Sequence, residues 1–298
     1  MAVKKINRGE KTLQFFIYIC IVFLSLAILL PCLNILALSF NDGMDASRGG
    51  VSFWPRVFSP DNYLEVFRDG KVMRAYRVTI ARTITGTMLK LAITAMAAYA
   101  LKFKFLPFRK SINFLITFTM LFGGGLIPTY ILYAQLKLVN NFWVYVLPRL
   151  VDVIHLMMIR TAFETIPGSL EESAKLDGCG YFRSFIQIIL PLSKAVIAVV
   201  ALFTAVSHWN DWFDGAFFMT SDKEWPVATV LQQMLNRVAG LNRETTNLTA
   251  LLVMERRQVT SDSLKMATVV ISTAPILCIY PFVQKYFTKG VMIGAVKG

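Results

Sequence analysis

The feature that most constrains this chain is an apolar run without a charged residue from Thr12 to Asn41. A cleavable signal sequence has a core of only roughly 7–15 apolar residues, so we expect this run to remain in the protein as a membrane span. Further stretches of about 20 apolar residues follow, and each can cross a hydrocarbon layer of roughly 30 Å as a helix. With 55% hydrophobic and 16% charged residues, the composition excludes an ordinary soluble domain. The sequence predicts an all-α, polytopic membrane protein with about six transmembrane helices.

We expect a single transmembrane domain over residues 1–298. Its expected parts, in chain order, are a first span at 12–40, an outer loop at 41–77, a five-span core at 78–284 and a tail at 285–298. The expected spans of the core are 78–100, 111–134, 142–159, 186–207 and 264–283. The core also contains two long connections, an inner loop at 164–185 and an outer loop at 208–263.

Lysine and arginine are dense in the short segments before the first span, after residue 100, around 160–185 and after 284. In the two long loops the cations are diluted and largely balanced by Asp and Glu. Because cytoplasmic segments are enriched in Lys and Arg, both termini are predicted to be cytoplasmic. The formal net charge of +13 is then mainly a property of the cytoplasmic face. It requires no nucleic-acid partner, and membrane lipid is the expected environment.

No pattern in the sequence indicates a catalytic or metal site. Three of the four cysteines fall in expected spans and none in an outer loop, so no disulfide framework is suggested. The two histidines share no zinc-ligand spacing, and the motifs GxxxxGK[ST], HExxH and GxSxG are absent. We therefore expect no enzyme activity, no bound metal and no cofactor on this chain.

The inner loop contains a short, charged segment between two apolar spans. Pro167 and Gly168 end the preceding helix, and Ser169 and Glu172 have the spacing of a capping box. Gly178 is suited to a left-handed C-terminal cap. The pattern predicts a helix of about eight residues along the cytosolic surface, with small side chains beside its charges. Such a helix fits the groove of a partner protein, or it is a capped loop helix without a partner.

The inner loop resembles the EAA loop of ABC importer permease subunits, in which E-A-A is followed at fixed distances by G and I-x-L-P. The matching positions are Glu172, Ser173, Ala174, Gly178, Ile188, Leu190 and Pro191. The stretch GGGLIPTY, the triplet HWN and the tail YPFVQKYFTKGVMIGAVKG resemble the carbohydrate-uptake branch, which includes maltose and alginate importers. The tail together with GGGLIPTY looks most like its subgroup for complex oligosaccharides.

The resemblance implies the type I importer transmembrane fold in a bacterial cytoplasmic membrane. It also implies the following partners: a second homologous permease subunit, two cytoplasmic ATPase subunits that bind ATP and Mg, and an extracytoplasmic sugar-binding protein. This chain would import an oligosaccharide by alternating access coupled through the EAA helix. The alternatives are a permease for an amino acid or phosphate, and an ion-coupled secondary transporter, whose internal repeat we do not see.

The resemblance also implies roles for the matched positions in coupling to the ATPase. Glu172 would make a polar contact near the docking groove, although a capping bond could be its whole role. Ala174 would allow close approach, and Gly178 would turn the chain. Small side chains at Ser173 and Cys179 fit the same purpose, and Asp177 would cap the helix or pair locally.

Ionisable residues inside spans are candidates for the substrate pathway, because they are costly in lipid. Lys90, Asp152 and His155 meet this condition, and so does Arg82. Asp152 and His155 are three residues apart, so we expect them on one helical face, either lining the pathway or clamping two helices together. Arg82 and Lys90 would snorkel to the interface or pair with Asp152. They also raise the hypothesis of an acidic sugar, which Asp152 and His155 weaken.

Further pathway candidates lie near the ends of spans. Trp209, Asn210 and Asp214 follow span 5, where an aromatic face and polar groups suit an oligosaccharide; neighbouring Trp212 fits a membrane interface better. Gly124 belongs to a glycine run that should bend span 3, either for close packing or to line the pathway. The amphipathic segment at 224–241 should lie on the membrane or reach the binding protein.

Overall fold

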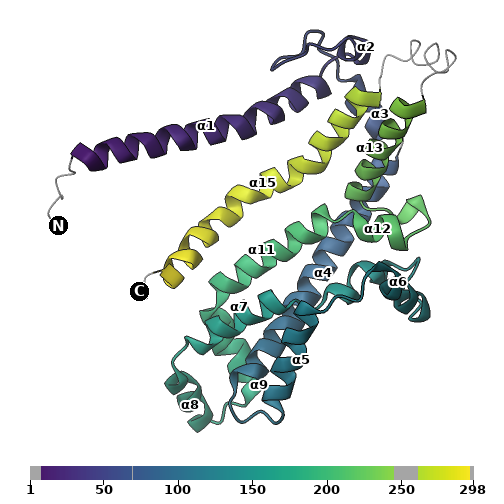
Figure 1. Ribbon diagram of the computed structural model, residues 1–298. Coiled ribbons are helices and arrows are strands. Elements are labelled where there is room, and N and C mark those ends of the chain that lie inside the picture. The colour runs from purple at the N-terminus through teal and green to yellow at the C-terminus, as the bar shows by residue number, and fades with distance from the viewer. Residues whose placement is uncertain (1–7, 69, 245–260, 296–298) are drawn as a thin grey trace. The chain divides into compact units, whose positions relative to one another are not determined.

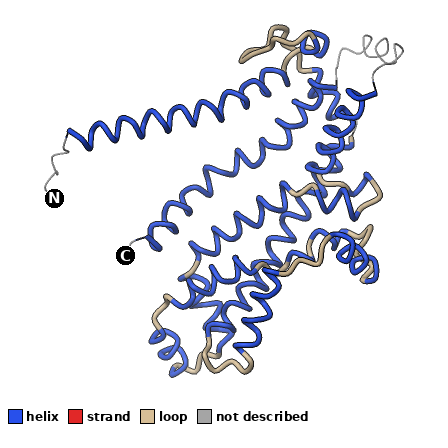
Figure 2. The backbone as a smooth tube through the Cα atoms, in the orientation of Figure 1, coloured by secondary structure: helices blue, strands red, loops and turns tan. Residues whose placement is uncertain are grey.

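The computed structural model describes residues 8–68, 70–244 and 261–295. Over these residues the regular structure is helical, and one isolated bridge joins Asn41 and Phe58 (Figures 1 and 2). The α-helices are α1 Arg8–Ser39, α2 Gly43–Ser47, α3 Asp61–Arg68, α4 Lys71–Lys102, α5 Arg109–Leu121, α6 Leu126–Gln135, α7 Val153–Glu164, α8 Gly168–Leu176, α9 Tyr181–Ser184, α10 Leu190–Leu192, α11 Lys194–Asn210, α12 Phe213–Phe218, α13 Val227–Glu244 and α15 Ser261–Ala295. The shorter turns are η1 Phe142–Tyr145, η2 Leu147–Arg149, the π-helical η3 Phe185–Ile189 and η4 Asp222–Glu224.

The chain divides into two compact units. The first unit comprises Met1–Gly70 and Gln233–Thr273, and the second comprises Lys71–Gln232 and Ala274–Gly298. Each unit is described by itself. The candidate site residues of the sequence all fall in the second unit.

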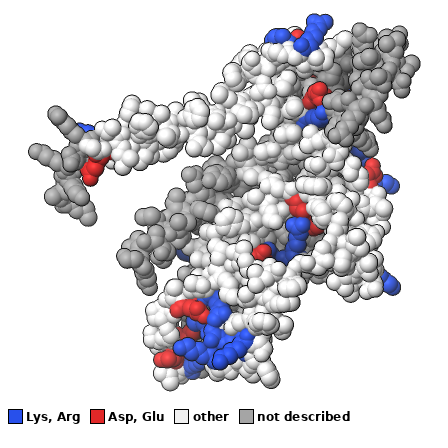
Figure 3. Space-filling view, in the orientation of Figure 1, with Lys and Arg blue, Asp and Glu red and all other residues white. Residues whose placement is uncertain are grey.

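In the first unit, α1 exposes apolar side chains from Leu13 to Leu33, and its surface between the ends is free of Lys, Arg, Asp and Glu (Figure 3). This is the surface expected of a lipid-facing helix. The expected outer loop after α1 is folded rather than open. Buried Asn62 donates hydrogen bonds to the carbonyls of Ser39 and Asn41, at 3.0 and 2.9 Å. Asp42 caps α2 by accepting from two of its backbone amides.

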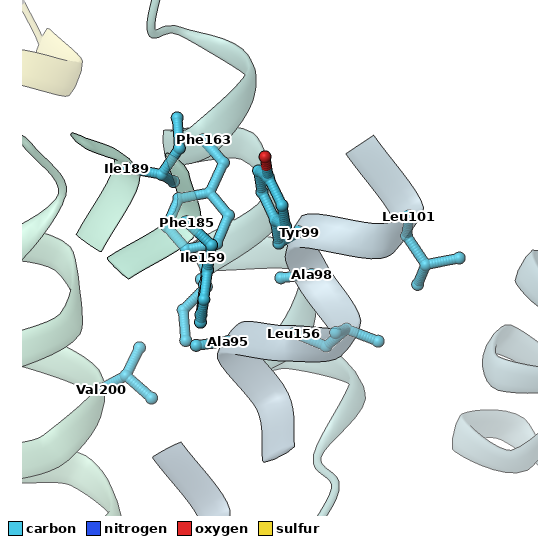
Figure 4. Packing of buried hydrophobic residues seen from close by; sticks show 10 residues of the cluster. All are labelled: Ala95, Ala98, Tyr99, Leu101, Leu156, Ile159, Phe163, Phe185, Ile189 and Val200. Atoms are coloured by element: carbon cyan, nitrogen blue, oxygen red, sulfur yellow. The ribbon is translucent and has the colours of Figure 1, made fainter. Parts of the chain in front are cut away.

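The core of the second unit is built by α4 packed against α7 and α11 (Figure 1). Small residues of α4, among them Ala95 and Ala98, let the aromatic rings of α7 and η3 approach closely. Tyr99 lies beside Phe163 and Phe185, with ring centroids 6.4 and 5.1 Å away (Figure 4). Within a membrane, such packing stabilises through close van der Waals contact between helices, which small residues permit, rather than through removal of apolar surface from water. This packing fixes the position of the helices that carry the site.

Three of the expected spans are broken. The glycine run bends the third, so that α5 and α6 meet at 119°, with Gly125 at φ +80°; the expected bend is confirmed. The fourth, expected as one helix at 142–159, starts instead as η1 and η2 and turns by 49° into α7. The fifth turns by 82° between Leu192 and Lys194. Two described helices could cross a membrane unaided, α1 and α4, and up to five spans result if each bent pair counts as one.

Candidate functional site

The charged segment of the inner loop forms α8, as expected, but its N-terminus differs from the prediction. Pro167 occupies the N-cap position, and no side chain caps the helix. The predicted capping box between Ser169 and Glu172 is therefore wrong. Both side chains are exposed, because the helix already starts at Gly168 and places Ser169 within its first turn. Glu172 has no capping role and is available to a partner.

The C-terminus of α8 agrees with the prediction. Gly178 adopts φ +79°. Its amide donates to the carbonyl of Lys175 at 3.0 Å, and the amide of Cys179 donates to that of Ala174 at 2.8 Å, which is the Schellman pattern. No atom lies within 4 Å of a Cβ placed on Gly178. The backbone conformation therefore requires glycine, while the surrounding space is open.

A buried ion pair holds α8 against the end of α4. The Nζ atom of Lys102 lies 2.7 Å from Oε2 of Glu171, with the side chains 12% and 9% exposed. Lys175 lies over the ring of Tyr181, 4.4 Å from its centroid. Sequence reasoning missed Glu171, since it stands directly before the matched Glu172. Only the position of α4 shows which of the two adjacent carboxylates faces inward.

The opposite face of α8 is open. Glu172, Ser173 and Asp177 are exposed, and Ala174 and Cys179 are half-buried. Leu176, which the sequence analysis did not single out, is 90% exposed. Leu170 of the same helix is also exposed, at 44%. Exposed leucines on a short charged helix are the kind of side chains that a partner's groove covers. Charged side chains gather at the end of the second unit that carries α8 (Figure 3).

A second cluster of charges lies near the other end of α4. Arg82, only 1% exposed, pairs with Asp211, and Arg149 pairs with both Asp211 and Asp214 at 2.9 Å. The expected pairing of Arg82 with Asp152 is thus wrong. Arg82 also lies over the ring of Tyr145, 5.1 Å from its centroid. Arg149 and Asp211 were missed, although Arg149 lies in an expected span and the rule that found Arg82 applies to it.

Asp214 lies after α11, at the start of α12, and is buried. Burial raises the pKa of Asp214 to about 6, with Arg149 acting in the opposite direction. Of its predicted neighbours, Trp209 approaches Tyr76 of α4, with ring centroids 6.1 Å apart. Asn210 is exposed at the end of α11. Asp214 therefore belongs to the charge cluster.

Lys90, Asp152 and His155 lie farther along α4 and at the start of α7. Asp152 is the N-cap of α7 and accepts a hydrogen bond from the amide of His155 at 3.0 Å. It precedes the helix and does not lie on its face, but the two side chains do meet: Oδ1 of Asp152 is 3.8 Å from Nδ1 of His155. Lys90 is buried at 7% exposure. Gly124 lies exposed at the break between α5 and α6, and no contact described joins it to these residues.

Comparison with known proteins shows which family the chain belongs to. Residues 153–293 match the family described as the binding-protein-dependent transport system inner membrane component. Protein LplC of Bacillus subtilis (strain 168) is 38% identical over 272 residues, covering 91% of this chain and 90% of the relative. The polygalacturonan/rhamnogalacturonan transport system permease protein YtcP of the same organism is 33% identical, covering 95% and 97%.

The fold is similar to that of a solved structure, a bacterial ABC transporter involved in the import of the acidic polysaccharide alginate. The TM-score is 0.85 at 25% identity, over 94% of this chain and 98% of that chain. These matches favour the importer over an ion-coupled secondary transporter, and they confirm the resemblance to carbohydrate ABC importer permeases. The chain therefore belongs to the family of inner-membrane components of binding-protein-dependent transport systems, the permease subunits of ABC importers, and has their type I transmembrane fold.

Proposed function

We propose that this chain is the permease subunit of an ATP-driven importer that takes up an oligosaccharide delivered by an extracytoplasmic binding protein. The observation that carries the proposal is α8, a helix fastened on one face by Lys102 and Glu171 and open on the other. The names of the relatives support the cargo, since YtcP and the solved importer both act on polysaccharides. A permease for an amino acid or phosphate is the second candidate, and these relatives do not favour it.

The assembly proposed contains a second homologous permease subunit and two cytoplasmic ATPase subunits. ATP and Mg are bound by the ATPase subunits, and this chain binds no cofactor and performs no catalysis. The location is the cytoplasmic membrane of a bacterium, with both termini in the cytoplasm, which the density of Lys and Arg in the short inner segments supports.

In this proposal α8 is the joint through which ATP-driven motion enters the membrane. Glu172, Ser173, Leu176 and Asp177 would contact the ATPase groove, and the small side chains of Ala174 and Cys179 would permit close approach. Closure of the ATPase pair moves α8, and the Lys102–Glu171 pair passes this motion to α4. Because α4 packs along α7 and α11, the three helices move together, as rigid-body alternating access requires.

The substrate pathway proposed runs past α4, α7 and α11. Trp209, Asn210 and Asp214 would stand near its outer end, and Lys90, Asp152 and His155 at mid-membrane. Gly124 would permit the break between α5 and α6, so that the backbone at this break would line the substrate pathway. The pairs among Arg82, Arg149, Asp211 and Asp214 satisfy one another's charges, so their proposed role is to hold the outer ends of the helices together.

The proposal is tested by co-purification from native membranes. The parent should bring down an ATP-hydrolysing subunit, and Gly178→Arg should not, since its side chain fills the open space beside α8. Gly49→Arg is the matched control: Gly49 has φ +73° and is equally open, but it lies in the expected outer loop. Both variants carry the same backbone strain, so loss of the ATPase in both would indicate misfolding. If the parent brings down no ATPase, the proposed function is wrong.

A further inference from the structure

Buried polar atoms without hydrogen-bond partners gather in the helices of the second unit. Those found among the described residues of α4, α7 and α11 are Arg82 Nε, Thr83 Oγ1, Thr87 Oγ1, His155 Nδ1 and Thr204 Oγ1. Such an atom costs about 1–3 kcal/mol even in an ordinary protein interior, and each one in a native structure calls for an explanation. One explanation is a polar ligand that passes between these helices and makes hydrogen bonds with these atoms.

The antiparallel packing of α4 and α11 places some of these groups at one level. Arg82 reaches Asp211, and Gly86 lies directly against the ring of His208. Farther along, Ala95 and Val200 belong to the same apolar cluster. As the residue number increases along α4, the number of the facing residue on α11 therefore decreases by about the same amount. In this register Lys90 and Thr204 lie opposite one another.

Lys90 is the charged member of this level. It is buried, and it makes no hydrogen bond or ion pair with any residue that the structure describes. Asp152 attracts it through space, but that carboxylate already accepts the amide of His155 and does not reach Lys90 as an ion pair. Arg82 and Arg149, by contrast, are both neutralised by Asp211 and Asp214. Among the residues described, Lys90 is thus a buried cation that Asp152 attracts only at a distance and that no carboxylate contacts, which is costly in a membrane.

His155 completes the surroundings. Its Nδ1 atom lacks a hydrogen bond, and its ring is stacked on Phe203 of α11 with centroids 6.3 Å apart and an interplanar angle of 5°. The side chain of Phe203 is partly exposed. Adjacent helices therefore contribute a cation, a hydroxyl and an imidazole Nδ1 atom that make no hydrogen bond, and an aromatic face. The carboxylate of Asp152 lies 3.8 Å from that Nδ1 atom and leaves its hydrogen-bonding capacity open. This set suits a carboxylated sugar ring, since the hydroxyls can bond to the polar atoms and the apolar ring face can stack.

We propose that Lys90, Thr204 and His155 form a mid-membrane site for the carboxylate and neighbouring hydroxyls of a uronic-acid residue in the transported oligosaccharide. The proposal rests on the proposed function and narrows its cargo to acidic oligosaccharides. Lys90 binds the carboxylate as a point charge, and Thr204 and His155 bond the hydroxyls. The acidic polysaccharides named for YtcP and for the solved importer are of this chemical class.

The test uses the assembled importer, purified from its native membrane and reconstituted in proteoliposomes with its binding protein. Uptake of trigalacturonate, of an alginate trisaccharide and of neutral maltotriose is measured. Loss of one charge-assisted contact should lower uptake of the acidic probes at subsaturating concentration by about 10- to 100-fold in Lys90→Gln. Lys90→Arg should retain most of it. Lys71→Gln, at the exposed start of the same helix, should behave as the parent.

The outcomes separate the two levels of the proposal. If loaded binding protein does not stimulate ATP hydrolysis by the parent and no probe enters, the proposed function fails. If the parent transports maltotriose and neither acidic probe, the importer stands and the uronate site is wrong. Equal uptake of the acidic probes by Lys90→Gln and the parent, at equal protein yield, also overturns the site. So does recovery in the double variant with Asp152→Asn, which would show that Lys90 serves to neutralise Asp152.

Discussion

Removing the cation of the Lys102–Glu171 pair should release α8 from α4. At 2.7 Å, an effective dielectric constant of about 20 gives roughly 6 kcal/mol of attraction, and withdrawing both charges from water offsets most of it. Lys102→Met leaves a nearly buried carboxylate with no cation, and its other oxygen, Oε1, already lacks a hydrogen bond. We expect the free energy that holds α8 in place to fall by about 2–3 kcal/mol.

Amide hydrogen exchange measures this release directly. A loss of about 2–3 kcal/mol corresponds to exchange in α8 that is about 30- to 140-fold faster, while α11 should keep its protection. Glu164→Gln is the control: Glu164 lies 2.9 Å from Arg160 and 3.7 Å from Arg109, but its side chain is 42% exposed. An exposed pair is worth at most about 1 kcal/mol, so exchange there should rise less than about 5-fold.

The charge-reversed double variant, Lys102→Glu with Glu171→Lys, separates the pair from its individual side chains. This double variant should recover most of the hydrogen-exchange protection of α8, because the ion pair can form again with the two charges exchanged between the helices. The reasoning is refuted if Lys102→Met leaves exchange in α8 within the range of the Glu164→Gln control. It is also refuted if the double variant is worse than either single one.

Three further changes have expected outcomes. Gly178→Ala should cost about 1 kcal/mol because of the positive φ alone, seen as faster exchange in the last turn of α8; no effect would contradict the left-handed cap. Gly86→Ala should cost about 1–3 kcal/mol in thermal unfolding because the new Cβ meets His208, and His208→Ala in the same chain should recover part of it. Burial raises the pKa of Asp214 in the folded state to about 6, above its ordinary value of 3.8, so between these pH values the native state binds a proton that the unfolded state releases. The stability that this group contributes is fully present below about pH 4 and is lost as the pH rises through 6. When the pH is lowered from 7 to 5, the free energy of unfolding of the parent should therefore rise by about 1 kcal/mol, and that of Asp214→Asn should not. Equal pH profiles of the melting temperatures of the two proteins would contradict this.

Much of the fold could be predicted from the sequence because membrane helices are specified by long, local patterns. Three predicted features depend only on residues that are close together in the sequence. They are the apolar run after Thr12, the glycines before Leu126 and the turn at Gly178. The prediction of the fourth span as one continuous helix was wrong, because the break depends on Pro148 and on the side chain of Asp152, which caps the start of a new helix. A hydropathy pattern does not distinguish a continuous apolar helix from two shorter elements joined at such a cap.

The sequence could indicate which types of residue belong to the candidate site, but not which of them form ion pairs with one another. Ionisable residues inside spans pointed to α4 and α7, which carry the charges described above, since such residues are rare without a purpose. Which cation meets which carboxylate depends on the register of α4 against α11, and this register is set by the contact between Gly86 and His208 and by the core around Ala95. For the same reason the sequence did not show that Glu171, rather than Glu172, faces α4.

The length of α4 gives its two attachments a mechanical meaning. The helix has 32 residues, so it is a rod of ~48 Å at 1.5 Å per residue. One attachment, at Lys102, receives the push from the docking helix; the other, at Arg82, is a brace ~30 Å away along the axis. With Lys90 between them, a tilt of ~10° about the brace would sweep that ammonium through ~2 Å and Lys102 through ~5 Å. A rigid lever of this kind turns a large displacement at the edge of the membrane into a small one at its middle, which is the scale on which a hydrogen bond is made or broken.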